Sequence, residues 1–326
     1  MTVPLRHPHP AVPEGPYADH QIVATGLGFP EGPVALPDGS VLVVEIEQGC
    51  LTRIFPDGSR VVAARTGGGP NGAAVGPDGA IYVCNNGGFD WHREPGILRP
   101  GGPSKDYTGG SIQRVDLRTG AVETLYTECD GHPLHGPNDL VFDRHGGFYF
   151  TVNGKRRERE IDRGGVYYAR PEGGSIRATI FPIPFPNGVG LSPDERTLYV
   201  AETETGRLWK FAIESPGKVT ILPYPSPSGG VYVWGSADYQ RLDSLKVEAD
   251  GRVCVATLIR GRVSSVNDDG SGLEFAQMPD RTTTNLCFGG ADMRDVHVTL
   301  SSTGQLAKMR WPRPGLKLNF QDIARC

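Results

Sequence analysis

Six polar residues recur at one position of a repeated pattern, namely Glu31, Asn71, Asn138, Asn187, Asp243 and Asn285. Each stands seven residues before the polar pair of the turn that follows, as Glu31 does before Asp38-Gly39. Side chains alternate between faces along a strand, so six equivalent strands in equal phase would turn these residues the same way. If the strands converge, two carboxylates and several amide oxygens meet at one place.

Such a set is suited to a metal ion with a preference for oxygen. Glu31 and Asp243 supply two negative charges, Asn138 and Asn187 supply neutral oxygens, and the six positions include no His or Cys. All-oxygen sets select hard cations, and calcium accepts several bulky ligands more readily than magnesium does. Without an ion, two close carboxylates would repel each other and one would be driven to protonate. We therefore predict one divalent cation, Ca²⁺ first, with Zn²⁺, Mn²⁺ or Mg²⁺ as alternatives.

A competing interpretation treats these residues as turn formers, because Asn-Gly is a common hairpin signal and occurs at Asn71-Gly72 and Asn187-Gly188. Each repeat already has its turn seven residues later, which favours the metal site for Glu31, Asn138, Asn187 and Asp243. For Asn71 and Asn285 a hydrogen-bonding role in the lining of a channel, toward substrate, is sufficient.

The elements that must position these residues repeat as well. An apolar run follows each turn, as at residues 41–44 and 81–84, and a glycine then opens an alternating strand, as at Gly49 and Gly110. Six units of three or four strands predict an all-β fold, a six-bladed β-propeller with the metal site in its central channel. We expect one domain over residues 1–326, preceded by an extension over 1–20.

Both chain ends are expected in the last blade. Residues 21–24 and 304–311 each read as a short strand, and pairing them would close the ring without an exposed edge. The polar tail after Pro312 is expected on the outside.

Composition excludes some partners. Lys and Arg number 33 against 37 Asp and Glu, so the net charge of −4 argues against nucleic acid and anionic membranes. No signal-peptide core or run of eighteen apolar residues occurs, and the expected location is cytoplasmic. The six cysteines show no metal-binding spacing and are expected to be free buried thiols. A small molecule remains as the partner, and the oligomeric state stays open.

Two connections are longer or more charged than a strand link requires. Residues 86–109 are rich in Gly and Pro and are interpreted as a lid or substrate loop, with Asn86, Trp91 and His92 as candidate substrate contacts. Residues 153–160 are strongly charged and fit either a solvated connector or part of the site.

Taken together in order, these pieces make the chain resemble the SMP-30/gluconolactonase/luciferin-regenerating-enzyme family. The matching pieces are Glu31-Gly32-Pro33, Pro137-Asn138-Asp139, the segment from Pro186 to Asp194, and Asp243 ahead of residues 248–251. The resemblance implies one divalent ion on the propeller axis, held by Glu31, Asn138, Asn187 and Asp243, and hydrolysis of a lactone or ester. One departure is that Gly136, next to His135, stands where sugar lactonases of this family often have Arg.

The ion predicts a mechanism in which it polarises the lactone carbonyl while a base activates water. Asp243 is the preferred base, with His135 and Asp139 as alternatives, and Asn138 is expected to contact substrate as well as metal. No Gly-x-Ser-x-Gly segment indicates a serine nucleophile. The competing functions are an organophosphate triesterase and a non-catalytic calcium-binding propeller scaffold.

Overall fold

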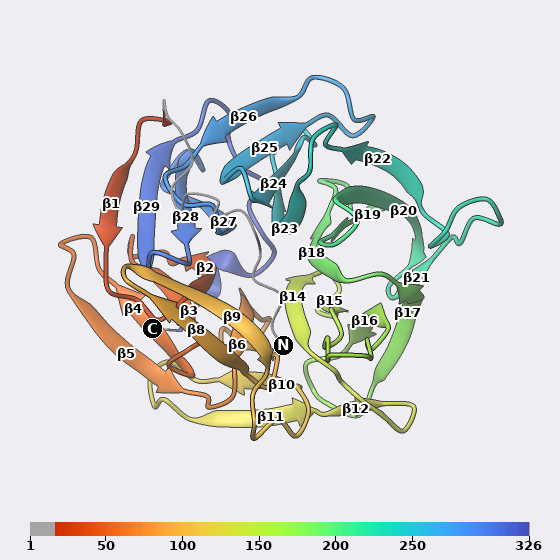
Figure 1. The fold of residues 1–326 in the computed structure, drawn as a ribbon, viewed down its shortest axis with the longest axis horizontal. Coiled ribbons are helices and arrows are strands. Elements are labelled where there is room, and N and C mark those ends of the chain that lie inside the picture. The colour runs from red at the N-terminus through yellow and green to blue at the C-terminus, as the bar shows by residue number, and fades with distance from the viewer. Residues whose placement is uncertain (1–16, 326) are drawn as a thin grey trace.

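A computed structural model of the chain describes residues 17–325, in which six antiparallel sheets form blades around a central axis and two further sheets are two-stranded hairpins (Figure 1). Blade 1 consists of β2 (Pro30–Ala35), β3 (Val41–Glu45), β4 (Cys50–Ile54) and β5 (Arg60–Arg65). Blade 2 consists of β6 (Pro70–Val75), β7 (Ile81–Asn85), β10 (Ser111–Val115) and β11 (Val122–Tyr126). Blade 3 consists of β14 (Pro137–Phe142), β15 (Phe148–Val152), β16 (Gly164–Ala169) and β17 (Ile176–Ile183).

The second half of the ring repeats this plan. Blade 4 consists of β18 (Pro186–Leu191), β19 (Thr197–Glu202), β20 (Arg207–Ser215), β21 (Lys218–Val219) and β22 (Val231–Gly235). Blade 5 consists of β23 (Arg241–Val247), β24 (Val253–Leu258), β25 (Arg262–Val266) and β26 (Glu274–Gln277). Blade 6 consists of β27 (Thr283–Gly289), β28 (Asp295–Leu300), β29 (Gln305–Arg310) and β1 (Gln21–Ala24). The six-bladed all-β propeller predicted from the repeats is thus confirmed.

The ring closes in blade 6, where the first strand pairs with the last. Gln21 lies opposite Lys308 and Ile22 opposite Ala307 in an antiparallel pair. Both predicted closing strands are confirmed. The proposed extension over residues 1–20 lies mostly outside the described residues.

The core consists of six hydrophobic clusters, one between each pair of neighbouring blades. Alternate side chains of each central strand are buried on either side, which explains why the runs at β3, β7 and β15 are continuously apolar. Of the six cysteines, the five in the described residues are buried and free, while Cys326 lies outside them.

Helix is nearly absent from residues 17–325, where the one helical element is the 3₁₀ turn η1 (Gln321–Ile323). No helix in that part of the chain is long and apolar enough to cross a membrane.

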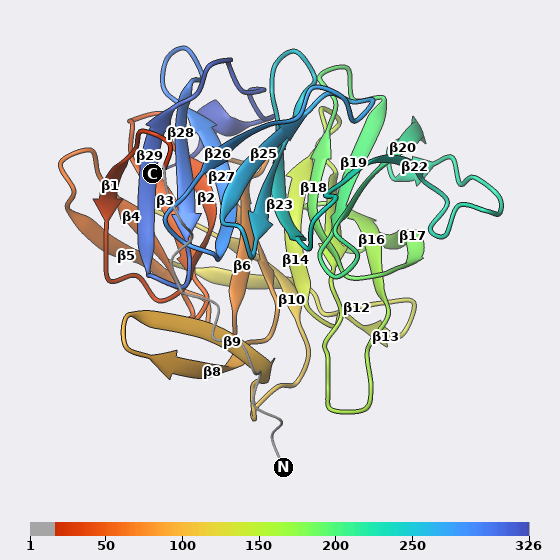
Figure 2. The same ribbon diagram turned by 45° about the horizontal axis from the view of Figure 1, so that its top comes forward.

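The insertion between β7 and β10 forms a hairpin of its own, β8 (Phe89–Glu94) paired with β9 (Ile97–Pro103). It lies on one face of the ring, as Figure 2 shows. Pro70 at the start of β6 pairs with Asn85 at the end of β7, so the hairpin leaves the ring at the end where the innermost strands begin. A smaller hairpin joins blades 2 and 3, with β12 (Glu128–Cys129) and β13 (His132–Pro133).

The tail after Pro312 does not run along the outside as expected but crosses the opposite face of the ring. Gly315 N donates to Met293 O in blade 6, Leu316 N to Val247 O in blade 5, and Asn319 Nδ2 to Phe142 O in blade 3. A cavity of about 360 Å³ lies between the tail and the later halves of β14, β18 and β23. This cavity is therefore at the other end of the inner strands from Glu31 and its equivalents.

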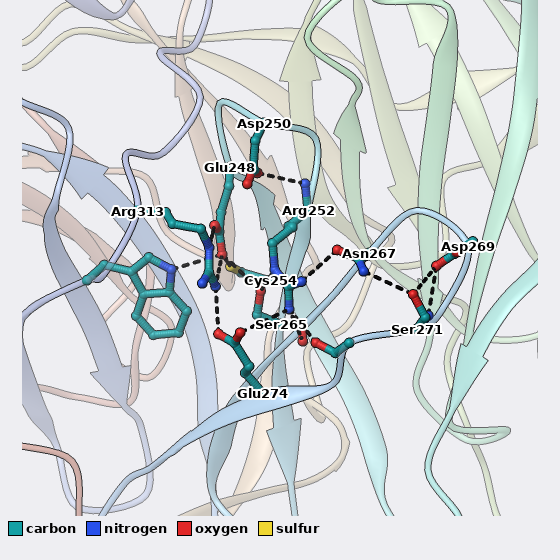
Figure 3. A network of polar contacts seen from close by, with 12 residues as sticks. Glu248, Asp250, Arg252, Cys254, Ser265, Asn267, Asp269, Ser271, Glu274 and Arg313 are labelled. Atoms are coloured by element: carbon teal, nitrogen blue, oxygen red, sulfur yellow. Dashed lines mark hydrogen bonds and ion pairs between the residues drawn. The ribbon is translucent and has the colours of Figure 1, made fainter.

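A buried carboxylate fastens the tail to blade 5 (Figure 3). Glu248 is fully buried and accepts hydrogen bonds from Trp311 Nε1 at 2.9 Å, Ser265 Oγ at 2.9 Å and both Arg313 nitrogens of its ion pair. Burial works to raise the pKa of Glu248, but these hydrogen bonds, with that of Cys254, outweigh it and the pKa is lowered. The carboxylate is thus held in its charged form.

Candidate metal centre and channel

The innermost strands β2, β6, β14, β18, β23 and β27 neighbour one another around the axis, and all six predicted polar residues lie on them. Each of these strands has a β-bulge, and the predicted residue lies at it, as Asn187 does between Pro186 and Val189. A bulge bends the strand and re-aims a side chain. The equal spacing read from the sequence thus corresponds to one repeated backbone irregularity.

The glycines that follow some of these residues do not form hairpin turns. A Cβ on Gly72 would lie 2.5 Å from Asn138 O of the next inner strand, and one on Gly188 would lie 2.5 Å from Leu245 N. Glycine is required because neighbouring inner strands approach each other closely. Asn71-Gly72 and Asn187-Gly188 lie within strands β6 and β18, so the turn interpretation is wrong for both.

The two carboxylates of the proposed set are buried and influence each other. Burial raises the pKa of Glu31 to about 7, against hydrogen bonds from Asn285 and Gly32 that lower it. Burial, and after it the charge of Glu31, also raises the pKa of Asp243 well above its usual value. Burial and, for Asp243, repulsion from Glu31 therefore disfavour two charged carboxylates here.

The two amide oxygens of the set lack protein partners. Asn138 Oδ1 and Asn187 Oδ1 are buried and accept no hydrogen bond within the described structure. The Asn187 side chain is nevertheless held in place, because its Nδ2 donates to Thr203 Oγ1 at 3.0 Å. Buried polar atoms are normally satisfied, so two unpaired acceptors on equivalent strands are suited to be ligands of a cation. Residues 17–325 contain no cluster of three His, Cys, Asp or Glu side chains placed to hold a metal, so a site here has to include amide oxygens.

The other two predicted channel residues make hydrogen bonds to neighbouring strands. Asn71 Nδ2 donates to Asn138 O at 3.2 Å, and Asn285 Nδ2 donates to Glu31 Oε2 at 2.7 Å. Both side chains are buried. They support the strands and side chains of the proposed ligands, and their predicted contact with substrate stays a prediction.

The two alternative bases occupy different surroundings. Asp139 is buried, its Oδ1 accepts from Leu140 N at 2.9 Å, and its Oδ2 lies 3.4 Å from Lys246 Nζ.

His135 lies in the connection before β14 and is only partly buried, with Nδ1 2.7 Å from Asp162 Oδ2. Although partial burial opposes it, hydrogen bonds from Arg157 and His135 hold the pKa of Asp162 below its usual value. A charged Asp162 favours the proton on Nδ1 and leaves Nε2 as an acceptor.

The three candidates in the insertion separate into two groups. Asn86 is buried at the root of the hairpin. Trp91 packs on Phe29 of blade 1, with ring centroids 5.3 Å apart, and His92 is exposed. Leu98 N also donates to Ser302 O of blade 6, so a hairpin that starts in blade 2 is anchored on blades 1 and 6. Trp91 is therefore placed as an anchor of the hairpin.

Several polar residues of this region were missed in the sequence analysis. Thr151 in β15 donates to Asn187 O at 2.6 Å, and Ser301 donates to Pro30 O at 2.6 Å, so each supports the strand of a proposed ligand. Thr151 was detectable as the polar interruption of an apolar run. Lys155 is buried within the charged segment 153–160, which excludes a fully solvated connector, and no local signal distinguished it from its neighbours.

Comparison with known proteins gives consistent results. Residues 29–302 match the family model described as SMP-30/Gluconolactonase/LRE-like region. A lactonase drp35 of Staphylococcus haemolyticus is 30% identical over 253 residues, covering 77% of this chain and 70% of the relative. A lactonase drp35 of Staphylococcus aureus strain MRSA252 is 29% identical over 245 residues, covering 74% and 68%.

Solved structures share the fold. A gluconolactonase of Xanthomonas campestris has a TM-score of 0.71 at 21% identity, covering 94% of this chain and 99% of that one. A calcium-binding regucalcin of Agrobacterium tumefaciens has a TM-score of 0.71 at 18% identity, covering 95% and 98%.

Proposed function

Because the chain belongs to the SMP-30/gluconolactonase/LRE-like family, we propose that it is a metal-dependent hydrolase that opens a small lactone by attack of water on the carbonyl. Its curated relatives are named lactonases, which supports a carboxylic-ester hydrolase acting on cyclic esters. The observation that carries the proposal is the pair of buried, unpartnered amide oxygens of Asn138 and Asn187, on inner strands equivalent to those of two buried carboxylates.

Glu31, Asn138, Asn187 and Asp243 would hold the cation. Four oxygen donors with two negative charges suit calcium first, and a structural neighbour is named a calcium-binding protein. When bound, such an ion supplies Lewis-acid polarisation of the lactone carbonyl and stabilises negative charge on its oxygen.

Residues of the chain accept and return the proton of the attacking water. Asp243 accepts a proton from the attacking water as the water oxygen bonds to the carbonyl carbon. The bond from that carbon to the ring oxygen then breaks, and the proton passes to the departing ring oxygen, giving a hydroxy acid. Asp139 is less suited to this role because Lys246 pairs with it. His135, oriented by Asp162 and located just before β14, is the alternative acceptor.

The test is hydrolysis of a panel of sugar and simple lactones, with an aryl phosphotriester alongside, before and after chelation and on readdition of calcium. Lactone opening that is lost on chelation and restored by calcium supports the proposal. Calcium-dependent turnover of the phosphotriester alone would assign the organophosphatase alternative. Stoichiometric calcium binding without turnover of either class would assign the scaffold.

A further inference from the structure

Lys155 is a buried lysine in the connection that follows β15, with 3% of its surface exposed. Its Nζ donates to Asn86 Oδ1 at 3.3 Å and Gly88 O at 3.1 Å. The same Nζ lies 3.9 Å from the ring centroid of Phe89 and 5.1 Å from that of Tyr107. No carboxylate of residues 17–325 lies within ion-pair distance of this ammonium group. A buried cation is usually paired with an anion, so its surroundings of neutral oxygens and rings are unusual.

Two further hydrogen-bond donors beside Lys155 are unused. Asn86 Nδ2 and Tyr107 Oη are buried and have no partner within the described part of the chain. Asn86 Oδ1 already accepts from Lys155 Nζ and from Gly88 N at 2.8 Å. An ammonium group has three N–H donors, of which two are used here. The number of hydrogen-bond donors on Lys155, Asn86 and Tyr107 therefore exceeds the number of acceptors around them.

This donor cluster lies at the same end of the inner strands as the proposed metal centre. The connections carrying Asn86 and Lys155 leave β7 and β15 at the end where the inner strands begin. A Cβ built on Gly136 would lie 3.6 Å from Lys155 Cε, and Gly136 precedes the proposed ligand Asn138 by two residues. The cluster is thus beside the strand that would carry a metal ligand.

We propose that Lys155, Asn86 and Tyr107 form a subsite for a carboxylate group, and that the natural substrate is a lactone bearing a carboxylate away from its reacting carbonyl. The inference rests on the proposed lactonase function and specifies its substrate class. A carboxylate offers about four lone-pair positions and one negative charge, which matches one ammonium, one amide and one phenol donor. Hydrolysis of such a lactone gives a hydroxylated dicarboxylate.

The subsite lies at the root of the β8–β9 hairpin. Gly87, Gly88 and Gly109 at its two stems have φ values of +82°, +94° and +126°, which are accessible to glycine without strain. Lys155 contacts the root of the hairpin through Gly88 and Phe89. An entering carboxylate would replace a neutral acceptor of Lys155 with a charged one.

The experiment compares two matched lactones, a γ-butyrolactone carrying a carboxylate and its carboxamide analogue, at saturating calcium. We expect kcat/KM of the protein to favour the carboxylate at least about tenfold, which corresponds to about 1.4 kcal/mol. Lys155→Met should remove this preference, because it should lower kcat/KM for the carboxylate more than for the carboxamide. Tyr107→Phe, which removes one oxygen, should reduce the preference by about threefold. Lys218→Met, at an exposed lysine paired with Glu214 on the outer edge of blade 4, is the matched control and should leave the preference unchanged.

Equal turnover of the two lactones by the unaltered protein would overturn the subsite and leave the lactonase function standing. An equal loss on both lactones in Tyr107→Phe would also overturn it, and this variant decides if Lys155→Met does not fold. Binding is measured separately, through thermal stabilisation by glutarate compared with its diamide. Stabilisation by glutarate that disappears in Tyr107→Phe supports the subsite even if no lactone is hydrolysed, in which case only the proposed function fails.

Discussion

Asn285 donates a hydrogen bond from Nδ2 to Glu31 Oε2 at 2.7 Å, and so joins the innermost strands of the last and first blades. The same oxygen accepts from Gly32 N at 2.7 Å. The orientation of a proposed metal ligand is therefore set by a residue 254 positions later in the chain. Closure of the ring between blades 6 and 1 therefore also orients Glu31, a ligand of the proposed metal centre.

Asn285→Leu should weaken calcium binding while leaving every proposed ligand in place. Removing a residue that orients a metal ligand typically costs about ten- to a hundredfold in affinity. Calorimetric titration with calcium measures the change. Asn267→Leu, on an outer turn of blade 5 where Asn267 contacts Arg252 and Ser271, is the control. An unchanged affinity in Asn285→Leu would mean that Glu31 does not bind the ion.

Asp243→Asn separates the two roles proposed for this residue. The amide keeps an oxygen for the ion but cannot accept the proton from water. We expect calcium to remain bound and kcat to fall by about a hundred- to ten-thousandfold. Lactone hydrolysis at saturating calcium measures this. If most of the activity remained, Asp243 would be only a ligand, and His135 would be the base to test next.

Asn187→Ala should lower calcium affinity first, because it removes a ligand oxygen that has no other partner in the described structure. Excess calcium should partly restore activity. Asn71→Ala is the matched variant on a neighbouring inner strand, where the side chain bonds to a backbone oxygen. It should leave calcium affinity nearly unchanged and alter mainly KM. Equal effects of the two variants on calcium affinity would contradict the ligand assignment.

Lys155 should make stability rise with pH above neutrality. Burial and the neighbouring charge of Arg157 lower the pKa of Lys155 to about 7, against the opposing effect of Asp162. Between pH 7 and the ordinary lysine pKa near 10.5, the unfolded chain therefore binds a proton that the folded protein does not. The free energy of unfolding then increases with pH, by at most about 1.4 kcal/mol per pH unit.

Urea denaturation at pH 7, 8 and 9 measures the free energy of unfolding of the protein and of Lys155→Met. In the variant this free energy should not increase with pH in the same way. His135, Asp162 and Arg157, the other titratable groups around the cluster, are unchanged in both proteins. If the free energy of unfolding changed with pH equally in the two proteins, Lys155 would have an ordinary pKa.

Glu248→Gln tests the attachment of the tail. Breaking a buried ion pair leaves Arg313 without the buried one of its two carboxylate partners, and about 3 kcal/mol should be lost from the free energy of unfolding. Glu274→Gln removes the other carboxylate of Arg313, which is 54% exposed, and should cost less than about 1 kcal/mol. Chemical denaturation distinguishes the two. Similar losses in both variants would mean that the ion pair, and not its burial, determines the effect.

The sequence alone determined the number of blades, the strands within them and the phase of the inner residues. All three follow from local properties, since strand periodicity and turn residues act over a few positions and repeat six times. Because the pattern repeats, the sequence predicted that Glu31, Asn138, Asn187 and Asp243 occupy equivalent positions. Even the glycines after Asn71 and Asn187 were visible, although their reason, the close approach of neighbouring strands, was not.

Only the tertiary structure decided which loop residues meet. Lys155 contacts Asn86, 69 positions earlier, and His135 contacts Asp162, 27 positions later, in connections without periodicity. Trp91 packs on Phe29, and the tail crosses the face opposite the hairpin. A charged side chain in a loop is buried only if residues from another blade cover it. Such contacts are set by the closure of the ring, so no local pattern in the sequence records them.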